Sequence, residues 1–273
     1  MSTPAPDPNR IPSTAPLALW RRWWRRQSPS RQDRFITLGP LLAVVLFLAA
    51  VVAAFSYLRI EEIDREQQAV RRDVEYAQQR LRLRLLERQE QLMRIARDVA
   101  NREIGTEEFI VQAESLVNQY PELMAVIWVD NKKRIKTAYV SSSANLGQAR
   151  IPGELLKPGN EGTFELARDL RQPVYSRPLL NKESGAYSAP TLQLQVPMDD
   201  QGKFGGVIIG EYSIDGLLRF GVPTEVTAKY AVTLIDEKNV VLTGSVAPPR
   251  NPADRMQPWS EGQCQIIRCG QPL

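Results

Sequence analysis

One run of residues constrains this chain more than any other feature. From residue 35 to residue 58 no side chain is charged. A helix of this length, at ~1.5 Å per residue, exceeds the ~30 Å hydrocarbon core of a bilayer. The apolar part of a cleaved signal peptide is shorter, whereas this run leads directly into Arg59 and a charged segment. The sequence therefore predicts one transmembrane helix over residues 35–58, with a cleaved signal peptide as the alternative.

The basic residues are concentrated before this span. Residues 1–34 contain seven Arg and two Asp, whereas residues 35–273 hold 28 basic against 29 acidic side chains. Positively charged flanks stay in the cytoplasm. We therefore expect a single-pass protein of the bacterial inner membrane, with its amino terminus in the cytoplasm and its main domain in the periplasm. No nucleic-acid partner is expected, because the exported portion has no excess of positive charge.

The composition argues against catalysis. The 273 residues include no His, and neither of the common glycine-rich phosphate-binding loops is found. The missing His removes the commonest general base and the commonest zinc ligand. We therefore expect no enzyme activity, no metal site and no cofactor.

A long helix is expected to follow the span. Residues 59–103 contain no Gly and no Pro and are rich in Glu, Gln, Arg and Leu, all strong helix formers. Their apolar positions recur at steps of three, four or seven, close to a heptad seam that Gln67 and Arg88 interrupt. Such a seam fits packing against a folded domain over one part and against a second copy over another. A shorter helix is predicted from Thr106, as its N-cap, to Pro121.

Strands are predicted beyond Pro121, where short β-branched runs are separated by Gly, Pro, Asn and Asp. The expected strands cover residues 123–130, 134–140, 162–167, 173–180, 191–197 and 205–213. The pair Gly205 and Gly206 is interpreted as a turn into an apolar strand, with an anion-binding nest as the alternative.

One pattern occurs twice. The residues from Ala125 through Asp130 to Ile135 have counterparts from Ala231 through Asp236 to Val241. Each copy predicts a strand, a tight turn at the Asp and a returning strand. The repetition suggests two similar α/β modules in tandem, and a chance likeness of two hairpins is the alternative. Too few residues follow Ala231 for a complete second module.

These residues resemble a known family: the periplasmic sensor region of bacterial sensor histidine kinases, of the double Cache or PDC type, similar in layout to C4-dicarboxylate sensors. The resemblance covers about residues 34–245. It rests on the Arg-flanked span and on the phrases DVEYAQQRLRLRLLERQEQLMRIARDVA, YPELMAVIWVD, QPVYSRP and VPMDDQGKFGGVIIGEYSIDGLLRFGVPTEV. It implies a mixed α/β (α+β) fold with a PAS-like antiparallel sheet and flanking helices. It also implies a small ligand in the membrane-distal module and a homodimer that passes a shift along the long helix.

The sequence departs from that family in two ways. The second span, the cytoplasmic PAS module, the His-bearing helix and the ATP-binding domain of the kinases are not found up to Leu273. The Tyr, Arg, Trp, Tyr and Asp signature of the amino-acid-binding members is not found either. No kinase reaction is therefore expected of these residues, whether the chain is a natural product or a truncated kinase.

Five segments are expected from these observations. They are a disordered Pro-rich and Arg/Trp-rich cytoplasmic tail over 1–34, the transmembrane helix over 35–58, a long periplasmic helix over 59–104, a membrane-distal PAS-like sensor module over 105–222, and an incomplete second PAS-like module over 223–273.

A small carboxylate in the first module would need bidentate cations and hydroxyl donors near the sheet. Arg168, Arg171 and Tyr175 lie in a polar bridge between two predicted strands and are the main candidates. The further candidates for the ligand pocket are Trp128, Tyr139, Tyr187, Gln193 and Gln195. The two Gln residues share one strand face. In the alternative interpretation the two Arg residues pair with nearby carboxylates at the surface and the Gln residues face water.

The leading hypothesis is a membrane-anchored extracytoplasmic signal-sensing input region of a two-component sensor histidine kinase, acting by dimer rearrangement. The alternative is a single-span structural or scaffold protein of the bacterial envelope. Cys264 and Cys269 are expected to be unpaired or to form an intermolecular bond, because an extended strand would hold them too far apart for a disulfide.

Overall fold

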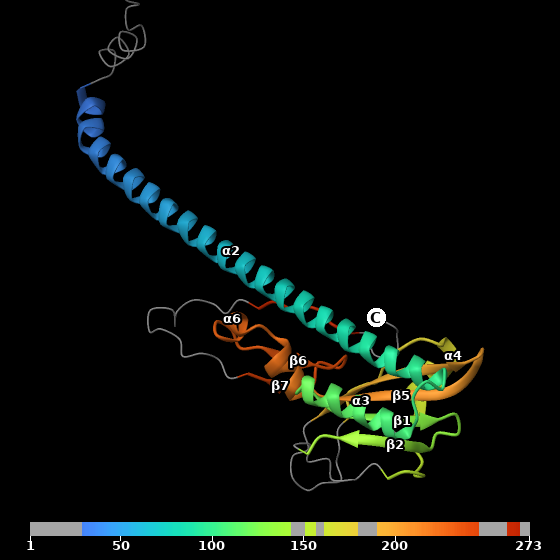
Figure 1. Cartoon of the computed structure of the whole chain (residues 1–273). Coiled ribbons are helices and arrows are strands. Elements are labelled where there is room, and N and C mark those ends of the chain that lie inside the picture. Colours follow the sequence, from blue (N-terminus) through green and yellow to red (C-terminus); the bar gives the residue numbers. More distant parts are fainter. Residues whose placement is uncertain (1–28, 143–150, 157–160, 180–189, 246–260, 268–273) are drawn as a thin grey trace, which may run out of the picture. The chain divides into compact units, whose positions relative to one another are not determined.

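The computed structural model describes residues 29–142, 151–156, 161–179, 190–245 and 261–267 (Figure 1). The chain forms two compact units, Met1–Arg65 and Glu66–Leu273. The described elements are α2 (Pro29–Ala100), α3 (Thr106–Gln119), β1 (Leu123–Asp130), β2 (Ile135–Val140), α4 (Glu161–Leu170), β3 (Val174–Tyr175), β4 (Thr191–Asp200), β5 (Lys203–Ser213), α5 (Ile214–Gly216), the π-helix η2 (Leu217–Gly221), α6 (Thr224–Thr227), β6 (Thr233–Ile235) and β7 (Val241–Gly244).

The single helix α2 contains both the predicted span and most of the predicted long helix. Among the described helices it alone has a segment long and apolar enough to cross a membrane. The side chains of that segment are exposed, with Phe47 68% exposed, as a surface that faces lipid requires. The described residues therefore contain one candidate membrane span, as predicted. No Gly or Pro separates the span from the following residues, and the helix continues to Ala100.

The second unit is built around a five-stranded antiparallel sheet of strand order β2-β1-β5-β4-β3. This arrangement with flanking helices confirms the predicted fold class. Strand β1 has the predicted bounds, because its apolar run ends at an Asp that turns the chain. Strands β4 and β5 form one hairpin, in which Gly206 lies opposite both Met198 and Asp130. Its φ of 129° and the close approach of the Val129 carbonyl leave no room for a Cβ, so the Gly pair belongs to the strand interior.

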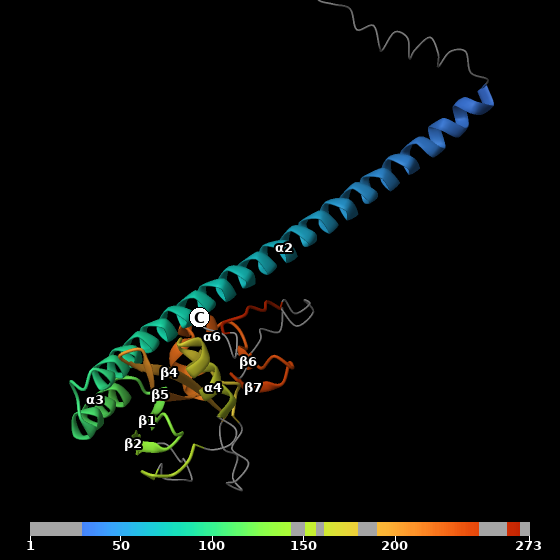
Figure 2. The same cartoon turned by 90° about the vertical axis from the view of Figure 1, so that its right-hand side faces the viewer.

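Helices cover both faces of this sheet (Figures 1 and 2). The carboxy-terminal part of α2 and helix α3 pack on one face, which we call the α2/α3 face. Its strand residues include Val126, Trp128, Leu192, Leu194, Ile208 and Tyr212. Helix α4 packs on the opposite face, the α4 face, whose strand residues include Ala125, Ile127, Val129, Val174, Val207 and Ile209. Because side chains alternate between the two faces of a strand, neighbouring strand residues pack against different helices.

Residues 162–167, predicted as a strand, lie in helix α4, so that prediction is wrong. Phe164 and Ala167 are three residues apart and fully buried on one side of the helix, which is the spacing of a helix face. Glu161 lies in the first turn, where a negative charge favours the helix dipole. The short run has too few residues to distinguish periods of two and 3.6, so the sequence was ambiguous here.

Two predicted boundaries also change. The N-cap of α3 is Gly105, whose backbone N–H donates to the Glu108 carboxylate at 3.0 Å, and Thr106 is already helical. The strand predicted over 173–180 is reduced to Val174–Tyr175. Pro173 and Pro178 flank it and have no N–H for a sheet hydrogen bond.

The repeated sequence pattern corresponds to two hairpins of the same local structure. Asp130 Oδ1 accepts hydrogen bonds of 2.8 Å from the backbone N–H groups of Lys132 and Arg134. Asp236 Oδ1 accepts bonds of the same length from the backbone N–H groups two and four residues later. Lys133 and Asn239, at matching positions, have φ values of 63° and 60°. The Asp therefore recurs because it closes the same turn; β6 and β7 form the second, two-stranded sheet.

Candidate functional site

A row of polar side chains lies on the α4 face of the sheet. Gln193 and Gln195 occupy alternate positions of β4, and Thr191 precedes them with the same spacing. Gln193 is directly opposite Glu211 of β5, and Gln195 is opposite Ile209, which belongs to the α4-face cluster. We call Thr191, Gln193, Gln195 and Glu211 the polar floor.

The polar floor is buried. No member is more than 2% exposed. Within the described part of the chain, Gln193 Oε1 and Thr191 Oγ1 have no hydrogen-bond partner. An unsatisfied buried polar atom costs about 1–3 kcal/mol. These atoms are therefore positioned to accept hydrogen bonds from a group outside the described residues.

The strands hold the floor in place through their backbones. Ser176, the residue after β3, donates its backbone N–H to the Gln193 carbonyl at 2.8 Å. The Ser176 hydroxyl accepts from the Gln193 N–H at 3.0 Å and donates to the Arg177 carbonyl at 2.8 Å. Both backbone groups of Gln193 are thus fixed, which leaves its amide side chain as the adaptable part of the site.

The two arginines predicted for ligand binding lie at the surface. Arg168 Nε donates to Asp169 Oδ1 at 2.9 Å, and this bond raises the pKa of Arg168. Arg171, with φ of 54° just after α4, donates to Asp199 Oδ1 at 3.4 Å. Their side chains are 46% and 42% exposed. The surface pairing considered as the alternative is the arrangement observed, and the structure does not bring these guanidinium groups to the floor.

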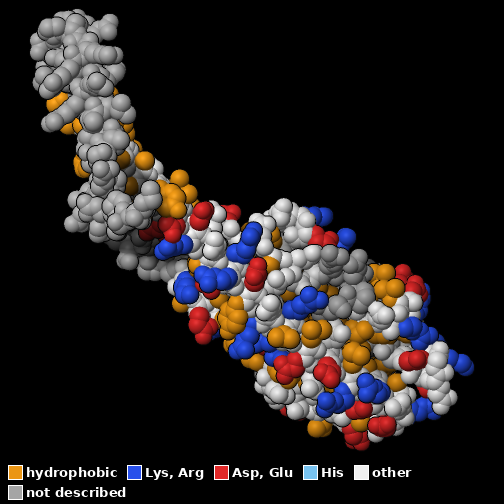
Figure 3. Space-filling view, turned by 90° about the horizontal axis from the view of Figure 1, so that it is seen from above, with side chains coloured by type: hydrophobic (Ala, Val, Ile, Leu, Met, Phe, Trp, Pro, Cys, Tyr) orange, Lys and Arg blue, Asp and Glu red, His pale blue; other side chains and the backbone are white. Residues whose placement is uncertain are grey.

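Basic and acidic side chains are also mixed elsewhere on the molecule. Figure 3 shows Lys and Arg interspersed with Asp and Glu over the face seen there. Exposed pairs of this kind contribute little to stability. Surface pairing of this kind therefore accounts for Arg168 and Arg171 without a bound ligand.

Trp128 and Tyr139, two further predicted residues, belong to the α2/α3 face. The Trp128 ring lies 5.6 Å from the ring of Phe109 of α3, between centroids, and Lys136 Nζ lies 4.3 Å from its centroid. The Tyr139 hydroxyl donates to Glu114 at 3.4 Å. Burial and the Glu114 carboxylate raise the pKa of Tyr139. These side chains join β1 and β2 to α3 and are separated from the floor by the sheet.

Tyr175 is also on the α2/α3 face. It is fully buried in the same cluster as Tyr212, and burial raises the pKa of both hydroxyl groups. Neither hydroxyl has a hydrogen-bond partner among the described residues. Of the eight predicted site residues, the structure thus brings together Gln193 and Gln195. Tyr187 lies outside the described residues.

Sequence reasoning missed Thr191 and Glu211. The alternation of polar and apolar residues in TLQLQVP was a usable signal for Thr191, because it extends the spacing of the two Gln residues by one step. Glu211 is the one acidic residue in the apolar phrase GGVIIGEYS, and a charge inside a buried strand is uncommon enough to indicate a site. Among the described residues no cluster of possible metal ligands is found. Cys264 has a free thiol, and Cys269 lies outside the described residues.

The comparisons with known proteins are as follows. No family model matches the sequence, and no curated protein matches it. Among solved structures, the ligand-binding domain of the Campylobacter jejuni chemoreceptor Tlp3 in complex with L-norvaline is similar, with 14% identity and a TM-score of 0.49 over 66% of this chain and 70% of that chain.

Two other similar structures have comparable values. The ligand-binding domain of the Pseudomonas aeruginosa PAO1 amino acid chemoreceptor PctC, in complex with GABA, has 13% identity and a TM-score of 0.45 over 65% of this chain and 75% of that chain. The extracellular domain of mmHK1S-Z2, named as a histidine kinase, has 13% identity and a TM-score of 0.46 over 62% of this chain and 69% of that chain. All three similar structures are described as ligand-binding or extracellular domains.

Proposed function

We propose that this chain is the extracytoplasmic sensory input region of a membrane-anchored receptor and that it binds a small molecule over the polar floor. The observation that carries the proposal is the pair of buried acceptors, Gln193 Oε1 and Thr191 Oγ1, without partners in the described structure. A ligand that donates N–H or O–H bonds to them offsets the cost of their burial.

The floor favours a ligand that bears a hydrogen-bond donor. The unpartnered Gln193 amide oxygen can only accept a hydrogen bond, and the Thr191 hydroxyl can accept or donate one. An ammonium or amide group can donate to both atoms. The carboxylate expected from the sequence would need a cation, and Arg168 and Arg171 are engaged by carboxylates at the surface. We therefore propose that an ammonium or amide group of the ligand meets the floor, whether or not the ligand also carries a carboxylate.

The proposed receptor lies in a bacterial inner membrane, with its amino terminus in the cytoplasm and residues 66–273 in the periplasm. The seven Arg residues of residues 1–34 support this orientation. The output is proposed to be a two-component histidine kinase, and the phrases in which the sequence resembles that family support this proposal.

We also propose that the receptor is a homodimer that forms through α2. Within the second unit, α2 exposes three large apolar side chains: Tyr76, Leu83 and Leu86, at 46%, 65% and 38% exposure. They recur at steps of seven and three, so they share one side of the helix. The same side of a second copy would cover them.

The ligand proposal is tested by thermal melting of the full chain in detergent micelles. The probes are a panel of small amines, amino acids and dicarboxylates that includes pentylammonium, 5-aminovalerate and glutarate as a matched set. A ligand at 100 times its Kd adds about 2.7 kcal/mol to the free energy of unfolding. We expect compounds with an ammonium group to raise the melting temperature.

The variant Gln193→Leu removes the unpartnered acceptor. It is expected to lose the ligand-dependent rise while melting at or above the wild-type temperature without ligand, because it no longer buries an unsatisfied oxygen. The matched control Asn118→Leu, at an exposed position of α3, is expected to keep the full rise. A rise with glutarate alone would refute the proposed ligand chemistry, and no rise with any probe would favour the scaffold alternative.

A further inference from the structure

Helix α2 presents a buried seam to the rest of the second unit, and one member of this seam is charged. The seam recurs at steps of four and three residues: Leu81, Leu85, Arg88, Leu92, Ile95 and Val99. Arg88 is only 8% exposed. A guanidinium in an apolar seam needs compensation, because burying an unpaired charge costs several kcal/mol.

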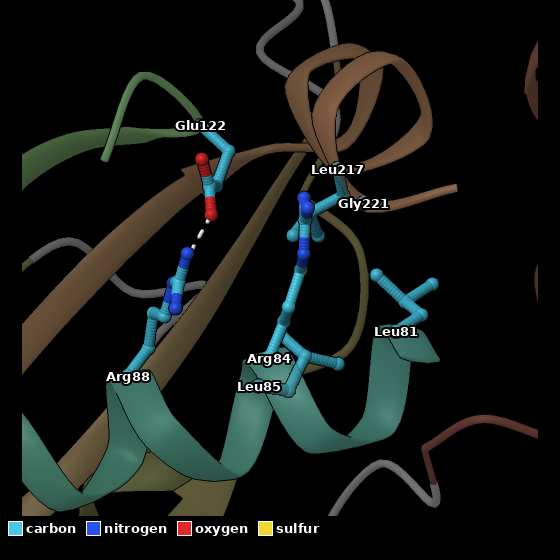
Figure 4. A pocket seen from close by; sticks show the side chains of 7 residues that line it. All are labelled: Leu81, Arg84, Leu85, Arg88, Glu122, Leu217 and Gly221. Atoms are coloured by element: carbon cyan, nitrogen blue, oxygen red, sulfur yellow. Dashed lines mark hydrogen bonds and ion pairs between the residues drawn. The ribbon is translucent and has the colours of Figure 1, made fainter. Parts of the chain in front are cut away.

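Three groups compensate this charge, and Figure 4 shows one of them, Glu122. Arg88 Nε donates to Glu122 Oε1 at 3.1 Å, and the Glu122 side chain is 5% exposed. A second nitrogen of Arg88 donates to Glu87 Oε2 at 2.7 Å. The Tyr120 ring centroid lies 3.8 Å from the guanidinium carbon, as in a cation–π contact. The guanidinium is therefore contacted by two carboxylates at its nitrogen atoms and by an aromatic ring at its planar face.

The surroundings of the pair are tightly packed. A small pocket lies beside Arg88 and Glu122 (Figure 4). Its other lining residues come from α2 and η2 and are Leu81, Arg84, Leu85, Leu217 and Gly221. These side chains leave no interior space for a water molecule. The pocket is thus a packed junction between elements, with no room for a ligand.

Glu122 is also connected to the strand that carries the floor. Its carbonyl accepts a hydrogen bond of 2.8 Å from the backbone N–H of Ser213, the last residue of β5. A Cβ at Gly216 would lie 2.9 Å from the Glu122 Cα, so the turn after β5 also packs directly on this residue. Ser213 follows Glu211 of the floor by two residues. A displacement of the end of β5 is therefore transmitted to Glu122 through a single hydrogen bond and a packing contact.

The position of Arg88 in the seam restricts how α2 can shift. A slip of the helix by one turn in either direction would move the guanidinium to the place of Leu85 or of Leu92, which are 2% and 0% exposed. The place of Leu92 belongs to the apolar core cluster, and the place of Leu85, although it lines the same junction as Glu122, is filled by a buried apolar side chain. A polar residue in an apolar seam specifies the register of the helix in this way, at a cost in stability.

We propose that the buried pair of Arg88 and Glu122 is a register latch, which fixes the axial position of α2 on the second unit and links it to the end of β5. The pair acts as a positioning device, and an apolar pair of similar size would serve stability equally well. The link to sensing rests on the proposed function, because it assigns the ligand to the floor that β5 carries. The register itself is a property of the ligand-free protein.

Pulsed electron resonance on the full chain in lipid nanodiscs tests the latch without any ligand. Nitroxides are attached to cysteines replacing Arg94 on α2 and Leu166 on α4, both exposed, in a background with Cys264→Ser and Cys269→Ser. The test variant carries Arg88→Met with Glu122→Leu. The control carries Lys229→Met with Asp73→Leu, which removes an exposed pair that also involves α2, with Nζ and Oδ2 3.3 Å apart.

We expect one narrow distance distribution for the wild type and for the control. The Arg88→Met/Glu122→Leu variant is expected to remain folded and to show a broadened or split distribution, with populations separated by up to about one helical turn, ~5.4 Å. A folded variant with the wild-type distribution would overturn the proposal. If this double variant does not fold, Glu122→Gln decides: a broadened distribution supports the latch, and a wild-type width overturns it. Because no ligand is added, this result is separate from the outcome of the melting test.

Discussion

At the scale of single residues, the environment decides which polar groups are available for function. Gln193 and Arg168 were both predicted to bind a ligand, but their environments differ. The Gln193 side chain is buried and its oxygen has no partner among the described residues, whereas the Arg168 side chain is exposed and pairs with a carboxylate. The sequence showed that Gln193 and Gln195 share a strand face. It could not show which face the helices would cover, because that depends on contacts distant in sequence.

Arg88 illustrates the same limit. The heptad pattern revealed it as an interruption of the seam, but its partner lies 34 positions later, immediately before β1. Glu122 has no special spacing in the sequence. The pairing depends on the fold, which brings the Arg88 side chain of α2 to the residue before β1.

The two buried tyrosines give a prediction for alkaline pH. Burial raises the pKa of Tyr175 and Tyr212 in the folded chain, whereas both ionise near pH 10 when unfolded. Below pH ~10 both tyrosines are protonated in the folded and in the unfolded state and do not make the stability depend on pH. Above pH ~10 the free energy of unfolding falls, because the unfolded state then releases protons that the folded state retains. Each of them is expected to lower the free energy of unfolding by about 1.4 kcal/mol per pH unit above pH ~10.

Urea unfolding of the full chain in detergent between pH 9 and pH 11 measures this loss. The variant Tyr212→Phe is expected to fold at least as stably as wild type at pH 9, since the hydroxyl that it removes has no partner in the described structure. Above pH ~10 its advantage over wild type should grow by about 1.4 kcal/mol per pH unit. An advantage that stays constant with pH would show that Tyr212 ionises in the folded protein.

At the scale of elements, prediction succeeded where the local pattern and the tertiary environment agree. Strand β1 has an apolar run and a turn-forming Asp, and its bounds were predicted correctly. The prediction for residues 162–167 failed because Phe164 and Leu166 fit the alternation of a strand, whereas Phe164 and Ala167 fit the face of a helix. The burial of Phe164 and Ala167 against the sheet selects the helix. The single helix from Pro29 to Ala100 follows from residues that favour helix throughout its second half.

The exposed side of α2 gives a prediction about assembly. Leu83 is 65% exposed on the side proposed to contact a second copy. Leu83→Glu would place two like charges at that contact, so we expect it to shift the chain from dimer to monomer. Light scattering after size-exclusion chromatography in detergent measures the mass.

A matched variant controls for the general effect of an added charge. Val111→Glu changes a residue of α3 that is also 65% exposed, and the dimer should persist. If Leu83→Glu is also dimeric, or if the wild type is monomeric at the same concentration, the proposed α2 interface is incorrect.

At the scale of the whole molecule, the described residues combine one candidate span with a folded unit that has a buried polar floor and a buried pair of Arg88 and Glu122. A sensory input region needs to be on the side of the membrane where its signal is found. The seven Arg residues before the span predict that this side is outside the cytoplasm. The proposed ligand binding, dimer and latch are each consistent with this placement, and the proposed function as an extracytoplasmic sensor requires it.

Reporter fusions at the carboxyl end, after Leu273, measure this placement directly. Alkaline phosphatase is active only outside the cytoplasm, and green fluorescent protein becomes fluorescent when it folds inside. The account predicts an active phosphatase fusion and a dark fluorescent-protein fusion, each with the full-length protein present in the membrane fraction. A fluorescent fusion together with an inactive phosphatase fusion would place residues 66–273 in the cytoplasm and contradict the account.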